Sequence, residues 1–491
     1  MKLKELLGAV GCRETSNLDD REITGLSTDS RTVKEGEIFI AVKGHELDGH
    51  DFIDQAVRNG ASAIVTDRMV GSRAPNCIVD DTSVAAALLA RRFFSDPAAN
   101  LLLVGITGTN GKTSASFLLD SILSCSIGRT GIIGTVGVGS MGELSASTHT
   151  TPESVHLYRT LSDFLERGCR AVVMEVSSHA AVQGRIAGLE FDLGVFMNIS
   201  RDHLDYHETL ERYVAAKELF VSTLIEPDRT KEPGILVYNA DDALVREVAD
   251  RFGGDTISFG FGGDAAVRGE NLEADLDGTR FGLTCDGESI GIELELLGSF
   301  SAYNALAAAA AARAVGVSLF DIKRGLERVG GVPGRFQVVS TGKGPKVVVD
   351  YAHTPDALER LLLFCKDLGP KRIITVFGCG GERDKGKRPI MGRIARDISD
   401  RVYVTDDNPR GEDPDGIIED ILSGSGRDVE VVRDRRVAIE RAVAEAGEGE
   451  IVVVAGKGHE TYQIIGNERL PFNDVEEAIR VLRMREVGDR N

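Results

Sequence analysis

The sequence predicts an α/β fold with three domains, and three observations support this prediction. A chain of 491 residues is long enough for two to four domains. Near-continuous apolar runs of strand length, at residues 171–178 and 193–200, alternate with helical segments, as in a buried parallel sheet. A second such series begins at residues 346–352. We therefore expect domains at residues 1–97, 98–332 and 333–491, with a parallel sheet in the central domain and a doubly wound sheet in the last.

The elements follow in order along the chain. In the first domain, residues 37–42 and 63–66 are strand-like, and residues 51–59 have a helical periodicity that ends before Gly60. The expected strands of the central domain are residues 101–108, 171–178, 193–200, 235–242 and 290–296, followed by an Ala-rich helix at 302–314. The expected strands of the last domain are residues 346–352, 372–378, 401–407 and 451–456, with helices at 356–368 and 436–446.

Composition excludes several classes of protein. The net charge of −20 argues against a nucleic-acid-binding surface, and an anionic ligand would need a locally basic site. No run of 18 apolar residues is present, so we expect no membrane insertion and no signal peptide. Seven cysteines without metal-type spacing suit a reducing cytoplasm. We expect a monomer in that compartment.

A glycine-rich loop, GITGTNGKTS at residues 105–114, lies between the apolar run 101–104 and the helical segment 115–123. In this context, backbone N–H groups and a helix N-terminus form a cradle for phosphate. Lys112 can reach the β and γ phosphates, and Thr113 offers a hydroxyl to Mg²⁺. Ile106 stands where the general pattern has glycine, so the match is to the variant GTNGK[ST]. An ordinary strand-to-helix turn is the alternative.

Three further residues of the central domain are candidates for chemistry. Glu175 ends an apolar strand, where a carboxylate is a natural Mg²⁺ ligand, and a carboxylate that caps a helix or pairs with a cation is the alternative. His203 lies in a polar turn just past another strand end. Lys217 lies on a helix among apolar residues, and its spacing alone indicates a surface lysine whose stem covers apolar groups.

In the last domain, three polar loops follow strands, at residues 378–389, 405–414 and 455–460. The third is not a phosphate loop, because no Ser or Thr follows its lysine. Arg383, Arg410 and Glu460 together provide two guanidinium forks and one carboxylate, which complement an amino acid. A solvated basic loop is the alternative for the first of them.

Ten ordered motifs between Thr28 and Gln463 resemble the ATP-dependent Mur ligases of peptidoglycan synthesis. They are GTNGKTS, MEVSSH, NISRDHLDYH, YVAAKELF, GSFSAYNALAA, VPGRFQ, DYAHTPD, CGGERDKGKRP, DDNPR and AGKGHE. The resemblance implies an N-terminal domain for UDP, a central P-loop ATPase domain and a C-terminal Rossmann-like domain for the amino acid. It also implies that ATP phosphorylates the D-glutamate carboxylate of UDP-N-acetylmuramoyl-L-alanyl-D-glutamate, and that the amine of meso-2,6-diaminopimelate displaces phosphate from the acyl phosphate.

The resemblance also implies the binding residues. The UDP-muramoyl dipeptide would contact Thr28, Ser30, His45, Glu46, Leu47, Thr150, Thr151, Ser177, Gln183 and Arg185, although His149 departs from the amide expected before the two threonines. ATP would contact Gly108, Thr109, Asn110, Gly111, Lys112, Thr113, Ser114, Asn304, Arg335, Asp350 and His353. Mg²⁺ would be held by Thr113, Glu175, His203 and Lys217. Diaminopimelate would contact Arg383, Asp407, Asn408, Pro409, Arg410, Gly456 and Glu460.

For Lys217 the resemblance reverses the surface interpretation, since this lysine matches one that the family carbamylates. CO₂ would convert the ammonium group into an anion able to ligate a second Mg²⁺. A partly apolar setting lowers the pKa of a lysine, which makes this reaction feasible. The expected cofactors are therefore Mg²⁺ and CO₂ as lysine carbamate, with ATP as co-substrate.

Arg410 bears on the choice of amino acid. Diaminopimelate differs from lysine by a second carboxylate, and Arg410 in DDNPR can bind it as a fork. An L-lysine-adding enzyme of the same family is the first alternative. A folylpolyglutamate ligase and a catalytically inactive nucleotide-dependent binding protein are the others. The motifs at 28–31, 150–151 and 406–410 argue against the folylpolyglutamate ligase, and Lys112, Glu175, His203 and Lys217 together argue against the inactive protein.

Overall fold

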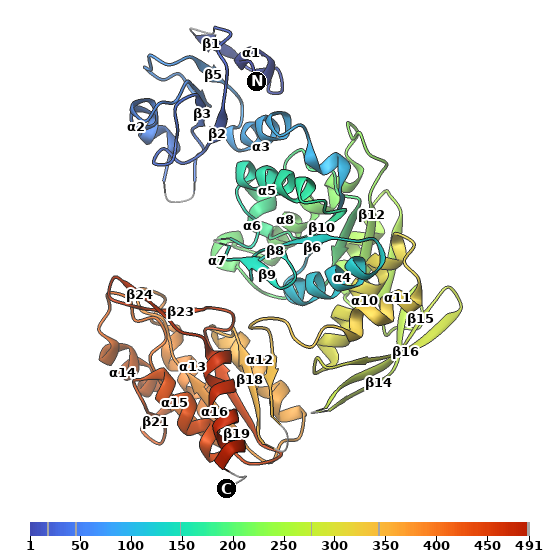
Figure 1. The fold of residues 1–491 in the computed structure, drawn as a ribbon, viewed down its shortest axis with the longest axis vertical. Coiled ribbons are helices and arrows are strands. Elements are labelled where there is room, and N and C mark those ends of the chain that lie inside the picture. The colour runs from blue at the N-terminus through green and yellow to red at the C-terminus, as the bar shows by residue number, and fades with distance from the viewer. Residues whose placement is uncertain (17–18, 45–46, 148, 276, 342–343, 489–491) are drawn as a thin grey trace. The chain divides into compact units, whose positions relative to one another are not determined.

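The computed structural model describes residues 1–16, 19–44, 47–147, 149–275, 277–341 and 344–488 (Figure 1). Its contacts divide the chain into two compact units. The first unit comprises residues 1–270, 283–290 and 303–326, and the second comprises residues 271–282, 291–302 and 327–491. The predicted α/β fold class is confirmed, with a sheet in each of the three predicted stretches. The limits of the three domains stay predictions.

The N-terminal sheet has the strand order β1-β5-β4-β3-β2. Its strands are β1 (Glu14–Ser16), β2 (Gly25–Ser27), β3 (Glu37–Ile40), β4 (Ala63–Thr66) and β5 (Asn76–Ile78). All pairs are parallel except that of the edge strand β1 with β5. The neighbouring helices are α1 (Leu3–Leu7), η1 (Gly49–Phe52), α2 (Ile53–Arg58), α3 (Thr82–Phe93) and η2 (Pro97–Asn100). Asp81 caps α3 by accepting hydrogen bonds from two backbone N–H groups, as an Asp at that position commonly does.

A disulfide joins Cys12 to Cys77 across this sheet. Cys77 lies in β5, and Cys12 precedes β1, which pairs with β5. This differs from the expectation of reduced cysteines, and the physical reason is proximity, because pairing of the two strands brings together residues 65 apart in sequence. Cys379, in a glycine-rich loop, is buried beside the Met391 sulfur.

The central sheet has the order β16-β15-β14-β13-β12-β11-β6-β10-β7-β8-β9. Its strands are β6 (Leu102–Thr107), β7 (Thr130–Ile133), β8 (Val138–Ser140), β9 (Glu143–Ser145), β10 (Ala171–Glu175), β11 (Leu193–Phe196), β12 (Ile235–Asn239), β13 (Thr256–Gly260), β14 (Val267–Asp275), β15 (Gly278–Cys285) and β16 (Glu288–Leu294). The helices of this part are α4 (Lys112–Ser126), α5 (Ser154–Glu166), α6 (Ser178–Val182), α7 (Leu204–His207), α8 (Leu210–Ser222), η3 (Thr223–Ile225), α9 (Ala243–Arg251), α10 (Ser299–Ala314) and α11 (Leu319–Glu327). Strand β6 pairs in parallel with β10 on one side and β11 on the other, which confirms the predicted parallel sheet.

Two glycines let α8 pack closely on this sheet. Gly105 of β6 and Gly194 of β11 are register partners. A Cβ atom at Gly105 would lie 2.5 Å from the Phe220 ring, and one at Gly194 would lie 2.7 Å from Leu224. Because neither glycine carries a side chain, Phe220 of α8 and Leu224 just after it occupy that space.

The C-terminal sheet, in the second unit, has the order β17-β18-β22-β19-β20-β21. Its strands are β17 (Gln337–Val339), β18 (Lys346–Asp350), β19 (Ile373–Phe377), β20 (Arg401–Val404), β21 (Glu430–Val431) and β22 (Ile451–Ala455), all parallel except β17, with a separate hairpin of β23 (Tyr462–Ile465) and β24 (Glu468–Pro471). The helices are α12 (Pro355–Asp367), α13 (Lys387–Ile398), α14 (Pro414–Ser425), α15 (Arg435–Glu445) and α16 (Asp474–Gly488).

Apolar residues along these strands alternate between two cores. Val348 and Val453 belong to the core that contains residues of α12, α13 and α14, whereas Val347 and Val452 belong to the core with α15 and α16. This alternation is the period of two that a strand imposes on its side chains. Helices therefore cover both faces of the sheet, as the prediction of a doubly wound domain requires. Among the described residues, no helix is both long enough and apolar enough to span a membrane.

Candidate active site

The glycine-rich loop connects β6 to α4, as predicted. Gly108 and Gly111 have φ angles of 147° and 87°, in the region that favours glycine. Gly111 forms the N-cap of α4, and a Cβ atom there would lie 2.3 Å from Asn304 Oδ1. The loop is also held at Asn110, whose backbone N–H donates to Asn198 Oδ1 at 2.8 Å. The result is a fixed turn of backbone at a helix N-terminus, which is suited to binding phosphate.

Two lysines converge on one carbonyl of this loop. Lys112 Nζ and Lys217 Nζ each donate a hydrogen bond to Gly108 O at 2.9 Å. Lys217, from α8, is 1% exposed, so the interpretation of it as a surface residue, based on spacing alone, is wrong. Burial, assisted by the charge of Lys112, lowers the pKa of the Lys217 amine well below its usual value. The neutral form of the Lys217 amine is therefore easier to reach than that of a lysine in water.

Glu175 lies at the end of β10 and is 1% exposed. Its Oε1 accepts hydrogen bonds from Thr113 Oγ1 at 3.0 Å and from the Thr135 backbone N–H at 2.9 Å, and its Oε2 accepts one from Thr135 Oγ1 at 3.1 Å. A carboxylate beside a hydroxyl is an oxygen donor set that fits Mg²⁺. Among the described residues, no cluster of three or more acidic, His or Cys side chains could hold a metal alone.

The turn that carries His203 is tied to the same loop. Thr109 Oγ1 accepts a hydrogen bond from the Ser200 backbone N–H at 3.0 Å and lies 3.2 Å from the Tyr213 hydroxyl. His203 has a φ of 52° and a half-exposed side chain, and its ring lies 5.0 Å from that of His179. A positive φ in a residue with a bulky side chain is uncommon and is typical of functional turns. Its role as a ligand stays a prediction.

Several residues expected to hold the muramoyl dipeptide lie around Glu175. Thr151 Oγ1 donates to the Glu175 carbonyl at 2.8 Å and accepts from the Ser177 backbone N–H at 3.1 Å. Arg185 Nη1 donates to Thr151 O at 2.9 Å, and Thr150 Oγ1 lies 3.0 Å from that of Thr135. The structure thus brings Thr150, Thr151, Ser177 and Arg185 together. Ser177 also caps α6, because its side chain accepts the Ala180 backbone N–H.

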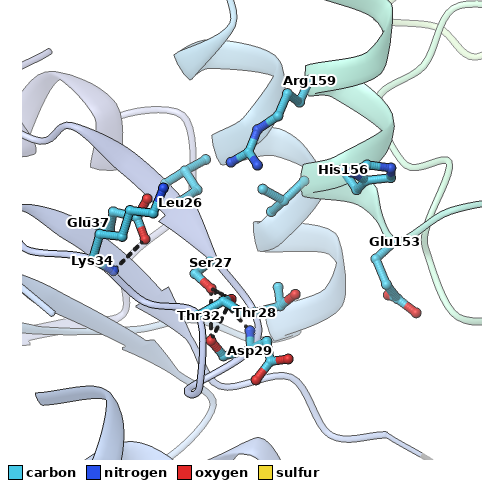
Figure 2. A pocket seen from close by; sticks show the side chains of 11 residues that line it. Leu26, Ser27, Thr28, Asp29, Thr32, Lys34, Glu37, Glu153, His156 and Arg159 are labelled. Carbon is cyan, nitrogen blue, oxygen red and sulfur yellow. Dashed lines mark hydrogen bonds between the residues drawn. The ribbon is translucent and has the colours of Figure 1, made fainter. Parts of the chain in front are cut away.

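A cavity of about 340 Å³ lies between the N-terminal sheet and α5 (Figure 2). Its lining includes Thr28 from the turn after β2, together with His156 and Arg159 from α5. Figure 2 shows the Arg159 side chain reaching from α5 toward the segment that carries Leu26. The sequence carries no signal for the two α5 residues, because only folding brings α5 to a turn more than a hundred residues earlier.

The other residues expected to contact the UDP-muramoyl dipeptide have different surroundings. Ser30 is buried and donates to Gln55 Oε1 at 2.9 Å, so its hydroxyl has a structural partner. Leu47 is exposed, and Gln183 Nε2 bonds the Tyr206 hydroxyl. His45 and Glu46 lie outside the described residues.

Three residues expected to complete the nucleotide site belong to the second unit, and their role there stays a prediction. Asp350 ends β18, and its carboxylate accepts from the backbone N–H groups of Phe336 and Ala352 at 2.7 and 2.8 Å. The Arg335 guanidinium lies 5.5 Å from the Tyr351 ring centre. Burial lowers the pKa of the neighbouring His353 imidazole. Arg335, Asp350 and His353 thus lie in one small region of the second unit.

The two arginine-bearing loops of the second unit lie against each other. Arg410 Nη1 donates to Gly381 O at 2.8 Å. A Cβ atom at Gly380 would lie 3.0 Å from Arg410 Nη1 and 3.8 Å from Arg383 Cγ. The structure therefore brings together the guanidinium-bearing loops that the sequence predicts to bind one ligand. Asp407 lies beside Gly456, at 2.9 Å from the position of a Cβ atom there.

Family models match three stretches of the chain. The Mur ligase family catalytic domain matches residues 22–94, the Mur ligase middle domain residues 106–312, and the Mur ligase glutamate ligase domain residues 334–458. A relative in Bacillus licheniformis, named UDP-N-acetylmuramoyl-L-alanyl-D-glutamate–2,6-diaminopimelate ligase, is 42% identical over 484 residues, which cover 98% of this chain and 99% of the relative. The chain belongs to the Mur ligase family.

Two further comparisons agree with the membership of this chain in the Mur ligase family. A relative of the same name in Bacillus cereus is 40% identical over 479 residues, covering 97% of this chain and 98% of its own. A solved structure of a ligase of that name is 33% identical, has a TM-score of 0.71, and is matched over 99% of this chain and 100% of its own.

Two fully buried cations of this Mur ligase were not among the predicted site residues. Arg388, in α13, pairs with Glu412 and Asp420 and donates to Gly380 O. Lys457 follows β22 and bonds Asn408 and Glu460. For Lys457 the sequence shows only a lysine between two glycines, and its partnership with Asn408 depends on strand order in the folded sheet.

Proposed function

We propose that this chain is an ATP-dependent ligase that joins meso-2,6-diaminopimelate to the D-glutamate of UDP-N-acetylmuramoyl-L-alanyl-D-glutamate in peptidoglycan synthesis. The observation that carries the proposal is the near end-to-end similarity to two ligases of that name. Arg410, beside Gly381 in the second unit, supports it. We further propose that the enzyme acts as a monomer in the cytoplasm, where its nucleotide-linked substrates are made.

In the first step, a D-glutamate carboxylate oxygen attacks the γ-phosphorus of ATP, and ADP leaves. Lys112 neutralises phosphate charge from its position on the glycine-rich loop. Thr113, Glu175 and His203 would hold Mg²⁺, which spreads the charge that develops on the phosphate oxygens. Thr150, Thr151, Ser177 and Arg185 would orient the dipeptide so that its carboxylate faces the phosphate.

Lys217 is proposed to act as a carbamate. Its Nζ must be neutral to attack CO₂, and burial favours the neutral form. The product is an N-carboxylated lysine, formed with loss of one proton, whose oxygens suit Mg²⁺ better than an amine does. The same lysine without CO₂ would offer no anionic oxygen where a ligand for a second Mg²⁺ is required.

In the second step, the amine of diaminopimelate attacks the acyl phosphate carbon, a tetrahedral intermediate forms, and phosphate leaves. Arg383 and Arg410 would bind carboxylate, and Glu460 with Asp407 and Asn408 would bind the ammonium end. A lysine substrate would leave one guanidinium without its carboxylate partner, which costs affinity. The cavity beside Thr28 and Arg159 would take the uridine end of the nucleotide substrate.

Phosphate release with a chosen amino acid tests the proposal. Purified enzyme would receive ATP, Mg²⁺ and UDP-N-acetylmuramoyl-L-alanyl-D-glutamate, with either meso-diaminopimelate or L-lysine. We expect sustained release only with diaminopimelate, together with a product whose mass corresponds to the tripeptide. Faster release with L-lysine would favour the lysine-adding alternative, and no release with either would contradict the proposal.

A further inference from the structure

Lys457 places a buried ammonium group next to two residues proposed to bind the amino acid. It lies between Gly456 and Gly458, just after β22, and its side chain is 0% exposed. Its Nζ donates to Asn408 Oδ1 at 3.0 Å and to Glu460 Oε2 at 2.9 Å. A buried charge requires such partners, because removal from water is costly unless the charge is paired and hydrogen-bonded.

The three side chains form a closed ring of hydrogen bonds. Asn408 Nδ2 donates to Glu460 Oε2 at 2.9 Å, the same oxygen that Lys457 Nζ reaches. Asn408 Oδ1 also accepts the backbone N–H of Ile464 at 2.9 Å. Because the oxygen and the nitrogen of the Asn408 amide are both engaged, the amide has a single orientation.

The ring also determines how Glu460 meets a ligand. Both of its bonds from this ring reach Oε2, and within the described part of the chain no hydrogen bond or ion pair reaches Oε1. The Glu460 side chain is 17% exposed, so the carboxylate lies at the edge of the buried cluster. Oε1 is therefore the oxygen left for an ammonium group of a ligand.

Lys457 is linked to Arg410 through the same ring. Asn408 and Arg410 both bond the backbone of β23, since the Ile464 N–H donates to Asn408 and the Arg410 N–H donates to Ile464 O at 3.1 Å. Arg410 has a φ of 54°, a conformation that surrounding contacts must hold in a residue other than glycine. Loss of the Lys457 ammonium would remove one of the three hydrogen bonds that hold the Asn408 amide and would so loosen this turn.

We propose that Lys457 is a positioning residue for the amino-acid substrate. It holds Glu460, both directly and through the Asn408 amide, in the orientation in which Glu460 Oε1 binds an ammonium group of the incoming diaminopimelate, and it does not contact the substrate itself. This inference rests on the proposed function of the site. It predicts that the effect of removing Lys457 passes through Glu460.

The kinetic test uses Lys457→Met, which keeps an unbranched side chain one atom shorter and removes its charge. We expect the KM for diaminopimelate to rise on the order of 10²-fold, as for a small misplacement of binding groups, while the KM values for ATP and for the UDP substrate change less than about twofold. Lys457→Arg, which restores a cation and its donors, should recover most of the loss. Equal rises in all three KM values would overturn the proposal.

A double-mutant cycle separates action through Glu460 from a general loss of stability. Residues that act as a unit give non-additive effects, so Lys457→Met in a Glu460→Gln background should weaken diaminopimelate use by less than about threefold more. Independent, multiplying losses would show that Lys457 acts elsewhere. If Lys457→Met does not fold, the same cycle is run with Lys457→Gln, which removes the charge and keeps a polar side chain.

A crystal structure of Lys457→Met without ligand tests the role of Lys457 without depending on the proposed function. We expect the 2.9 Å bond between Asn408 Nδ2 and Glu460 Oε2 to be lost, with the C-terminal sheet unchanged. Unchanged Asn408 and Glu460 side chains would overturn the inference even in an active diaminopimelate ligase. Conversely, failure of the wild-type enzyme to use diaminopimelate would contradict the proposed function, and this structure would still decide the role of Lys457.

Discussion

Replacing Arg410 with alanine tests the basis of amino-acid choice. Arg410 Nη1 is held by Gly381 O at 2.8 Å and by Asn408 O at 3.4 Å, so one edge of the guanidinium is fixed by the protein. Among the described residues, no hydrogen bond or ion pair is made by Nε or Nη2, which leaves these donors for a carboxylate. The side chain is half-buried, so such a contact would be partly shielded from water.

The expected loss follows from these contacts. A hydrogen bond to a charged group contributes about 1.5 kcal/mol or more, so two of them contribute about 3 kcal/mol. At 1.36 kcal/mol for each factor of ten, Arg410→Ala should raise the KM for diaminopimelate on the order of 10²-fold. Arg410→Lys keeps the charge without the fork and should lie between the variant and the wild type.

The assay is phosphate release against diaminopimelate concentration, with ATP and the UDP substrate saturating. Arg427→Ala is a matched control in the same unit, because Arg427 is 82% exposed and should be silent. The preference for diaminopimelate over L-lysine should fall as well. L-lysine has no second carboxylate to bind Arg410, so its KM should change little. A diaminopimelate KM within about threefold of wild type would refute the assignment of Arg410. A parallel loss with L-lysine would show that the variant damages the loop instead.

Three other changes have defined outcomes. Lys217→Ala should abolish phosphate release and regain part of it when a small carboxylate such as acetate is added, whereas full activity without rescue would rule out the carbamate. Burial raises the pKa of Asp120 to about 6, so the wild type loses stability as the pH rises through 6 and carries a penalty of about 3 kcal/mol above it. Asp120→Asn should therefore raise the Tm at pH 8, with a gain that shrinks toward pH 4.5, and a gain of equal size at both pH values would contradict this explanation. Without reductant, Cys12→Ser should lower the free energy of unfolding by about 4 kcal/mol, because the variant lacks the disulfide with Cys77. With reductant present, the variant and the wild type should be equally stable. A wild-type Tm that does not change when reductant is added would contradict this prediction.

The strands and the phosphate loop were predictable because their signals are local. The apolar run at 171–178 becomes β10, although the strand stops at Glu175. It stops there because Ser177 accepts the Ala180 backbone N–H and so starts a helix. The gathering of polar side chains at one edge of each sheet was also predictable, because parallel strands have their carboxyl ends at the same edge.

Features that depend on distant partners were not predictable. The spacing around Lys217 resembles that of a surface lysine, and only packing of α8 against the glycine-rich loop makes it buried. An odd number of cysteines does not indicate which of them form a disulfide, so the bond between Cys12 and Cys77 could not be predicted from the sequence. Lys457 and Arg159 derive their importance from residues about fifty and more than a hundred positions away, and no local pattern contains that information.

The paired glycines of β6 and β11 have a consequence for reading natural variation. Gly105 and Gly194 set how deeply α8 seats on the sheet, because Phe220 and Leu224 fill the space where their side chains would stand. The same helix carries Lys217. The absence of a side chain at Gly105 and Gly194 therefore determines how closely the Lys217 amine approaches the glycine-rich loop. A glycine-to-alanine change at Gly105 would look conservative in a sequence alignment, would lie in strand β6 at a residue with no proposed ligand contact, and would still withdraw the lysine from the Gly108 carbonyl. Such a variant would lose activity although every residue of its active site is unchanged.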